Sequence, residues 1–142
     1  MPRPTRTPIG LQLARTAKSV SRAFDAALAE AGGSTPTWLV LIAVKTQAMG
    51  NQRELAESIG IKGATLTHHL NAMEAEGLLT RRRDPANRRR HVVELSEAGE
   101  QAFARLAVAA QAFDKRLRDG FDDEEIAVLE KLLHRLRANA TA

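Results

Sequence analysis

Apolar residues recur at three- and four-residue steps along the first thirty residues, which is the period of an amphipathic helix. The stripe consists of Leu13, Ala17, Val20, Phe24, Leu28 and Ala31. Thr7 precedes it as a candidate N-cap, with Pro8 at the first helical position. Gly32 and Gly33 follow it as a stop signal. The pattern therefore predicts a helix over roughly residues 8–32.

A second, shorter helix is predicted directly after these glycines. Thr35 and Pro36 repeat the start signal of the first helix. The apolar residues that follow are Trp38, Leu39, Leu41, Ile42 and Val44. Such a density of apolar residues indicates burial on most sides, so we expect Trp38 in the core. Stacking of Trp38 on a ligand is the alternative.

Two short helices joined by a glycine-containing turn come next. Asn51, with a glutamate three residues later, has the spacing of a capping box for a helix over residues 52–58. A second helix is predicted over residues 64–76, and Gly60 and Gly77 end the two helices. The inward positions of the second helix are Leu66, Leu70 and Met73. This arrangement is that of a helix-turn-helix.

Between its inward positions, the helix over residues 64–76 carries hydrogen-bonding groups rather than Glu–Lys pairs. The polar set is Lys62, Thr65, Thr67, His68, His69 and Asn71. Short donors and acceptors of this kind can enter a major groove and read base edges. The acidic residues Glu74 and Glu76 lie only at the far end. The pattern therefore predicts a recognition helix that docks by its N-terminal half.

The most basic stretch of the chain spans residues 81–90, which contain six arginines and one aspartate, whereas the whole chain has a net charge of only +4. The arginines are Arg81, Arg82, Arg83, Arg88, Arg89 and Arg90. They flank the turn-forming sequence Asp-Pro-Ala-Asn, and strand-favouring residues lie on either side. We expect a β-hairpin with arginines at its tip. Six like charges without a counter-charge are unfavourable unless a polyanion binds them, so the stretch predicts contact with nucleic acid.

Two further helices are predicted after the hairpin. Ser96 can cap a helix from Glu97 to about Arg118, and at over about 30 Å this helix is longer than a small domain can cover alone. Its heptad-like seam is Phe103, Leu106, Ala110, Phe113 and Leu117. Asp122 and Glu125 form a capping box for the last helix. The apolar stripe of that helix is Ile126, Leu129, Leu133 and Leu136. Together with the first helix, these two predict a dimerisation bundle across a two-fold axis.

Composition narrows the class of protein. A chain of 142 residues with 44% hydrophobic and 27% charged residues suits one folded domain. The absence of cysteine excludes disulfides and thiolate catalysis. No apolar run approaches the roughly 20 residues of a membrane span. Residues 1–7 are basic and proline-rich, which predicts a flexible basic arm rather than a secretory signal. We therefore expect a cytoplasmic protein with no membrane partner.

Other function classes have less support in the sequence. Gly-rich phosphate loops and nucleophile motifs are absent. His68 and His69 are adjacent on a helix and point about 100° apart, unlike the i, i+4 ligand pair of a helical metal site. We expect no enzymatic activity, no cofactor and no metal. Metal sensing by these histidines, non-specific architectural DNA or RNA binding, and a purely structural dimerisation module remain as alternatives.

The order of the predicted elements and one sequence motif resemble those of the MarR family of winged-helix transcription regulators, and the resemblance covers essentially the whole chain. Residues 84–99, DPANRRRHVVELSEAG, are similar to the wing signature of that family, Asp-x-Arg, three residues, Val-x-Leu-Thr, two residues, Gly. Arg89 matches the wing arginine, Val93 and Leu95 the strand core, and Gly99 the glycine at the helix start.

Three positions depart from the family pattern. Asn87 stands where an aspartate usually braces the wing arginine, and an amide supplies a hydrogen bond without charge pairing. Ser96 replaces the usual threonine and preserves the hydroxyl cap. His68 stands where many relatives have an arginine in the recognition helix.

The resemblance implies a mainly α fold with a small β-hairpin wing, in which a winged helix-turn-helix lobe joins a helical dimerisation bundle. Residues 8–142 then form a single MarR-type domain, with the winged helix-turn-helix over about 36–95 and dimerisation helices over about 8–32 and 97–138. It implies a homodimer that binds double-stranded DNA, with Arg89 the best candidate to enter a minor groove.

The resemblance also implies regulation. A member of this family is expected to repress transcription from a palindromic operator and to be released by a small-molecule effector, often an aromatic or phenolic anion. The effector would bind between the dimerisation helices and the DNA-binding lobe. The candidate lining residues are Phe24, Trp38, Phe113, Arg15 and Arg22. The alternative is that the aromatic residues fill the core and the arginines are solvated.

Overall fold

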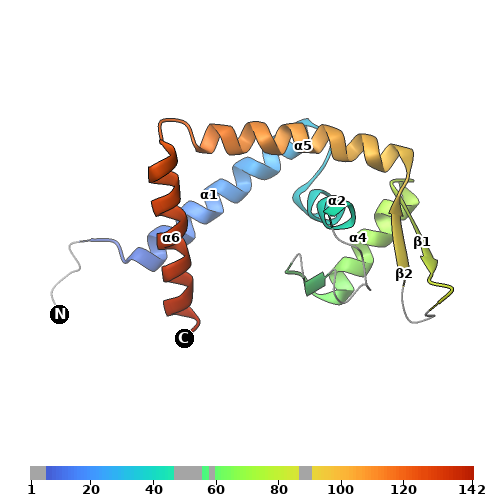
Figure 1. Cartoon of the computed structure of the whole chain (residues 1–142), viewed down its shortest axis with the longest axis horizontal. Coiled ribbons are helices and arrows are strands. Elements are labelled where there is room, and N and C mark those ends of the chain that lie inside the picture. Colours follow the sequence, from blue (N-terminus) through green and yellow to red (C-terminus); the bar gives the residue numbers. More distant parts are fainter. Residues whose placement is uncertain (1–5, 47–55, 58–59, 87–90) are drawn as a thin grey trace. The chain divides into compact units, whose positions relative to one another are not determined.

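The computed structural model describes residues 6–46, 56–57, 60–86 and 91–142, and the chain divides into two compact units, Met1–Ala110 and Gln111–Ala142 (Figure 1). Within the described ranges, the first unit holds α1 (Ile9–Glu30), α2 (Thr35–Thr46), α4 (Gly63–Ala75), β1 (Leu79–Arg83) and β2 (His91–Leu95). Helix α5 (Glu97–Leu117) begins in the first unit, and α6 (Asp123–Ala140) belongs to the second. The predicted mainly α fold with a small two-stranded hairpin is confirmed.

Helix α2 is central to the first unit, because it contacts α1, α4 and β2. Its residues Val40 and Leu41 are completely buried. Trp38 is buried as well, and its ring stacks on that of Phe103 with centroids 5.5 Å apart and planes inclined by 20°. The core position expected for Trp38 is thereby confirmed.

Both of the first two helices begin one residue away from the predicted caps. In α1 the N-cap is Pro8 rather than Thr7, because the backbone of Pro8 is extended and its carbonyl accepts the first helical bond, from Gln12. In α2 the cap is Ser34, whose Oγ accepts from the backbone N–H of Thr37 at 3.3 Å. Thr35, the predicted cap, instead donates its hydroxyl to Asp25 of α1.

Helix α4 ends as the sequence predicts. Gly77 has a φ of +78°, in the left-handed region that favours glycine. Its N–H donates to the carbonyl of Glu74 at 3.0 Å, and the N–H of Leu78 donates to that of Met73 at 2.9 Å. These are the two bonds of a Schellman motif. Of the predicted helix over residues 52–58, Ala56 and Glu57 are helical, and Asn51 lies outside the described residues.

The second unit contains the capping box that was predicted for the last helix. The backbone N–H of Glu125 donates to the carboxylate of Asp122 at 2.7 Å, and the N–H of Asp122 donates back to Glu125 at 3.1 Å. Helix α6 nevertheless contains no buried residue. Its exposed large apolar side chains are Val128, Leu129, Leu132 and Leu133.

No single helix in the described ranges is long and apolar enough to cross a membrane, whereas α1 and α2 together, bent by 79° at their junction, reach that length and composition.

Candidate nucleic-acid interface

Helix α4 separates its residues cleanly between a buried stripe and an exposed polar face. Leu66, Leu70 and Met73 are buried as predicted. Most of the predicted reading residues, Lys62, Thr65, Thr67, His68 and Asn71, are exposed, and His69 is half-buried. A single helix thus presents the donors and acceptors that the sequence assigned to base reading.

The N-terminus of α4 is suited to an anion. Lys62 occupies the N-cap position without a side-chain capping bond, and the first turn has no acidic residue. The unpaired N–H groups and the positive end of the helix dipole attract phosphate at such a position. Further along the same helix, the hydroxyl of Thr67 donates to the carbonyl of Gly63 at 3.0 Å.

The two histidines of α4 lie side by side. The ring centroids of His68 and His69 are 5.8 Å apart, with planes inclined by 58°. Within the described ranges, no group of three or more His, Cys, Asp or Glu residues is placed to hold a metal ion.

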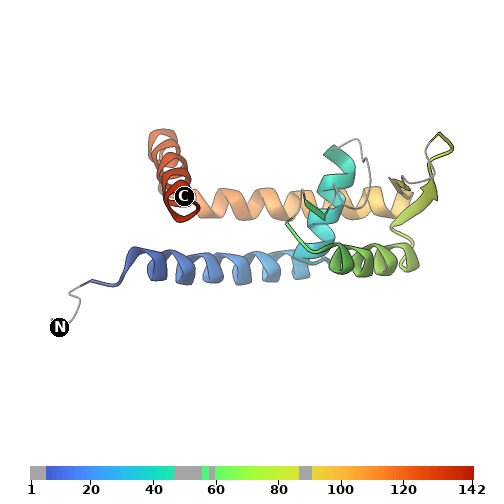
Figure 2. The same ribbon diagram turned by 90° about the horizontal axis from the view of Figure 1, so that it is seen from below.

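The hairpin runs antiparallel, with Leu79 opposite Leu95, Arg81 opposite Val93 and Arg83 opposite His91. It projects from the end of α4 as an arm (Figure 2). The first arginine triplet is therefore part of strand β1 and does not lie at the tip. This placement corrects the sequence-based expectation of arginines at the tip, which placed the strands on either side of the basic stretch.

Two of these arginines have counter-charges, which the sequence analysis had not found. Arg82 forms an ion pair with Glu94 of β2 at 3.1 Å, and both side chains remain largely exposed. Arg81 forms one with Glu74 of α4 at 3.3 Å. Arg83 is exposed, and no ion pair involves it within the described ranges. Part of the positive charge of residues 81–90 is therefore paired within the protein and needs no external polyanion.

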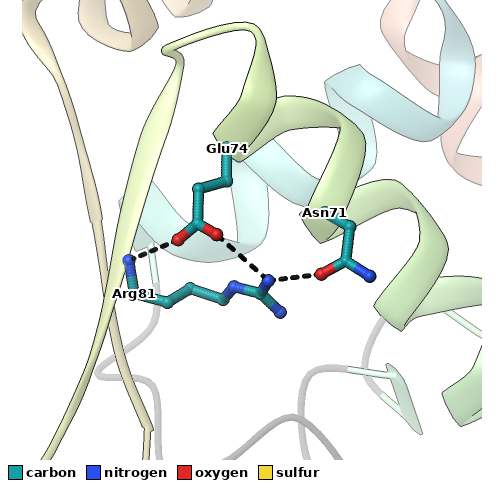
Figure 3. A network of polar contacts seen from close by, with 3 residues as sticks. All are labelled: Asn71, Glu74 and Arg81. Atoms are coloured by element: carbon teal, nitrogen blue, oxygen red, sulfur yellow. Dashed lines mark hydrogen bonds and ion pairs between the residues drawn. The ribbon is translucent and has the colours of Figure 1, made fainter.

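Arg81 joins the hairpin to α4 through a polar network that we call the Arg81 cluster, comprising Asn71, Glu74 and Arg81 (Figure 3). Its Nη2 donates to Oδ1 of Asn71 and, at 3.3 Å, to Oε1 of Glu74. Its backbone N–H donates to Oε2 of Glu74 at 3.2 Å. Only 18% of the Arg81 side chain is exposed. The residue was predicted to contact DNA, and in this structure its guanidinium faces α4.

The charge of Glu74 is stabilised by this network. The hydrogen bond from the Arg81 side chain is the main cause that lowers the pKa of Glu74, and the positive charge and the backbone N–H of Arg81 act in the same direction. Desolvation opposes them. The bonds and the charge of Arg81 therefore favour the ionised form of Glu74.

The base of the hairpin is fixed to the start of α5. The backbone N–H of Ser96 donates to the carbonyl of Leu78 at 3.0 Å, and its hydroxyl donates to the carbonyl of Gly77. The same hydroxyl oxygen accepts from the N–H of Gly99 at 3.1 Å, so Ser96 caps α5 as predicted. A Cβ at Gly99 would lie far inside van der Waals contact with the Leu78 carbonyl oxygen. This close approach explains the glycine of the wing motif.

The distal part of the hairpin includes residues that the structure does not describe. The carboxylate of Asp84 accepts from the N–H of Ala86 at 2.9 Å, as expected where a turn begins. The candidate DNA-binding residues Arg88, Arg89 and Arg90, and the atypical Asn87, lie outside the described residues. Their roles stay predictions.

The candidate effector residues have different surroundings in the part of the chain that the structure describes. Arg15 lines a hollow near the start of α1, which none of Phe24, Trp38 and Arg22 lines. Phe24 is half-buried against the core, and Arg22 is exposed. In the second unit, Phe113 is buried and the Arg116 guanidinium lies 5.9 Å from the centre of its ring.

Sequence reasoning missed the neighbours of Trp38. Phe103, which had been assigned only to the seam of α5, stacks on Trp38. The ammonium of Lys45 lies 5.7 Å from the centre of the Phe103 ring and pairs with Glu100 at 2.6 Å. The seam pattern predicted an inward position for Phe103, which is half-buried, but no pattern indicated which ring it contacts.

Comparison with known proteins agrees with this architecture. The MarR family model matches residues 34–91, which include α2, α4 and β1. A putative transcriptional regulatory protein for the hcr operon of Thauera aromatica is 28% identical over 129 residues, covering 90% of this chain and 78% of that protein. The crystal structure of the transcriptional regulator PA3341 is 30% identical, with a TM-score of 0.79, and the match covers 94% of this chain and 98% of that one.

A further similar protein, CouR, has been solved in two states. The transcriptional repressor CouR bound to a 23-mer DNA duplex is 26% identical, with a TM-score of 0.81 and 92% of both chains covered. CouR from Rhodococcus jostii RHA1 bound to p-coumaroyl-CoA is 25% identical, with a TM-score of 0.79 and 95% of both chains covered. The family model, the relatives and the winged-helix geometry agree: the chain belongs to the MarR family of transcriptional regulators, which are not enzymes.

Proposed function

We propose that this regulator is a sequence-specific repressor that binds a palindromic operator as a homodimer and is released by a small-molecule effector. The observation that carries the DNA-binding part is the exposed polar face of α4, supported from behind by the buried Leu66, Leu70 and Met73. A helix held in this way can enter a major groove with its reading residues preorganised. The DNA complex of the similar repressor CouR supports the same use of the fold.

The hairpin would supply affinity rather than sequence selection. Arg82 and Arg83 are exposed on β1, where they can approach phosphates beside the groove. Arg89 is proposed to enter the minor groove, on the strength of the wing motif. We therefore expect affinity to fall steeply with salt, because each neutralised phosphate releases counterions.

Homodimer formation is supported by the apolar side chains that α6 leaves exposed. Leu129 and Leu133 lie on one stripe, four residues apart, and Val128 and Leu132 lie beside it. Contiguous apolar surface of this kind marks an interaction site in a protein that works in water. A second copy of the chain would cover it and place two α4 helices in successive major grooves.

Release by an effector is proposed from the likeness to CouR, which has been solved with p-coumaroyl-CoA. An aromatic or phenolic anion fits the candidate residues, because Arg15 and Arg22 are exposed on α1 and can pair with a negative charge. Phe24, Trp38 and Phe113 stay the apolar candidates that the family resemblance implies. We also propose that the protein acts in the cytoplasm, in the same compartment as the DNA that it would bind.

Footprinting on the DNA that flanks the gene tests this proposal. A discrete protected palindrome, shortened or lost when phenolic anions are added, is the expected result. Uniform protection of any DNA would instead support a non-specific architectural protein, which shares the basic hairpin but needs no reading helix. Sedimentation of the protein alone tests the dimer, and a monomer at operator-binding concentrations would contradict it.

A further inference from the structure

Glu74 contacts strand β1 through both of its carboxylate oxygens. Oε2 accepts from the backbone N–H of Arg81 at 3.2 Å, and Oε1 accepts from Nη2 of the same residue at 3.3 Å. Arg81 is opposite Val93 in the hairpin, so a backbone N–H that points to α4 lies on the edge of β1 that faces away from β2. The carboxylate therefore satisfies a donor on the outer edge of the hairpin.

This contact holds the hairpin at a point beyond its base. The chain leaves α4 through the turn at Gly77, and Ser96 ties that turn to the returning end of the hairpin. Glu74 adds a second attachment at the third residue of β1, and the Arg81 side chain, which is only 18% exposed, extends over α4 as far as Asn71 (Figure 3). Two separate attachments fix the direction in which the strand leaves the helix, whereas one would let it swing.

Glu74 occupies a position where a carboxylate is otherwise unfavourable. It lies in the last turn of α4, where the negative end of the helix dipole repels it. In the proposed function, the phosphates of DNA approach the same helix and repel it as well. Its side chain is 43% exposed, and ion pairs between partly exposed groups contribute little to stability. A contribution to folding therefore does not account for this glutamate, whereas positioning of the hairpin does.

The direction of β1 determines where the next two side chains lie. Arg82 and Arg83 follow Arg81 directly on this strand, and both are exposed. Because Glu74 fixes the strand, the two guanidinium groups are presented beside the polar face of α4 before DNA binds. Contacts that are preorganised in this way lose less conformational entropy on binding, so the affinity is higher.

We propose that Glu74 is a positioning residue for DNA binding, an acidic side chain that raises the affinity for DNA by fixing the direction of the hairpin relative to α4. This role rests on the proposed function, in which α4 enters a major groove and the arginines of the hairpin approach phosphates. Removing the charge of Glu74 should therefore weaken binding, which is the opposite of what repulsion by a polyanion alone would produce.

The test compares Glu74→Ala with the matched control Glu76→Ala in gel shifts on the operator fragment found by footprinting. Both changes remove one negative charge from the end of α4, and Glu76 is exposed and forms no ion pair within the described ranges. We expect Glu74→Ala to raise the dissociation constant by about tenfold, because the hairpin is no longer preorganised. Glu76→Ala should leave the dissociation constant unchanged or lower it, because less negative charge then faces the phosphates.

Salt dependence separates positioning of the hairpin from a general loss of stability. The slope of log affinity against log salt should become shallower by about 1 per subunit in Glu74→Ala, because a phosphate contact of the hairpin is lost, and should not change in Glu76→Ala. Melting curves show whether each variant is folded at the temperature of the assay. If Glu74→Ala melts early, Glu74→Gln replaces it, with Glu76→Gln as the control. The glutamine can still accept from the backbone N–H but has no charge, so the affinity should fall by a smaller factor.

Two results would overturn the role of Glu74. If Glu74→Ala binds the operator as tightly as the wild type or more tightly, the carboxylate acts only as a repelling charge. If it binds more weakly with an unaltered salt slope, the phosphate contacts of the hairpin do not depend on Glu74. The proposed function fails in a different way, because a wild-type protein that protects no discrete site would refute sequence-specific binding whatever the variants do.

Discussion

Helices α4 and α6 are both amphipathic, but they use their apolar residues in opposite ways. In α4 the apolar side chains are inside: Leu66 and Leu70 are 0% exposed. In α6 they are outside: Leu129 is 46% and Leu133 41% exposed. The face that α4 leaves exposed is polar and suits the edges of a nucleic acid, whereas the face that α6 leaves exposed is apolar and suits another protein surface. The chemistry of an uncovered face thus indicates the kind of partner.

The largest effect should follow from removing apolar volume on the α4 side. Leu70→Ala leaves a cavity in a completely buried position, and we expect the free energy of unfolding to fall by about 2–5 kcal/mol. Chemical denaturation followed by circular dichroism measures it. A loss below about 1 kcal/mol would mean that α4 does not depend on this core and would remove the contrast with α6.

A smaller loss of stability is expected where α4 and the hairpin meet α5. Gly99→Ala forces a methyl group against the carbonyl oxygen of Leu78. Because this neighbour is backbone rather than a flexible side chain, we expect a destabilisation of about 1–3 kcal/mol in thermal or chemical unfolding. Gly63→Ala is a matched control, since a Cβ at Gly63 meets nothing within 4 Å. Equal stability of the two variants would contradict the close approach at Gly99.

Truncation on α6 should change association instead of folding. Leu133→Ala is expected to raise the dissociation constant of the proposed homodimer by roughly tenfold, about 1.4 kcal/mol, because a second copy would bury its apolar area there. Sedimentation over a range of concentrations gives that constant. Glu130→Ala serves as the control, because it truncates an exposed polar side chain one turn earlier on the same helix. A dimer equally stable in Leu133→Ala would place the dimer contact elsewhere.

Removing an exposed arginine of β1 should change the stability of the protein little and its affinity for DNA more. Arg82→Ala breaks an ion pair between two largely exposed groups, so the change in unfolding free energy should stay below about 1 kcal/mol. If Arg82 contacts a phosphate, the slope of log affinity against log salt should fall by about 1 per subunit. Gel shifts at several salt concentrations measure the slope. An unaltered slope would show that Arg82 keeps its ion pair with Glu94 in the DNA complex and contacts no phosphate.

The smallest expected effect is a change in stability with pH. The pKa of Glu74 is lowered in the folded protein, so its contribution to stability is present above its ordinary value of 4.5 and is lost as the pH falls through the lowered folded value. The stability difference between the wild type and Glu74→Gln should therefore be constant near neutral pH and shrink in acid. Urea unfolding at several pH values measures it. A difference that grew in acid would contradict the assignment of Arg81 as the partner.

Much of this fold could be predicted from the sequence because its signals are local. The buried stripe of α4 and the capping box at Asp122 each depend on residues within one or two turns. The start of α2 was placed one residue late, since adjacent hydroxyls at Ser34 and Thr35 both satisfy the capping pattern and only the contact with Asp25 distinguishes them.

The site was harder to predict because its contacts join separate elements. A run of arginines indicates a polyanion, and nothing in the run shows that Arg81 points to α4 or that Arg82 is paired with Glu94 across the hairpin. Those facts follow from the register and from the end of α4, which together bring residues 7 and 12 positions apart into contact. The candidate effector residues stay a prediction, because no local pattern specifies which of them would come together.

The bonds of Ser96 to Gly77 and Leu78 have a consequence for how this family of regulators can diversify. They close the hairpin at its base, so the chain leaves the helical body and returns to it at one fixed corner. Lengthening a loop beyond such a corner adds only about 0.6 kcal/mol for each doubling of its length. The length and charge of the arm can therefore change at little cost to stability, while the helices at its base keep their arrangement.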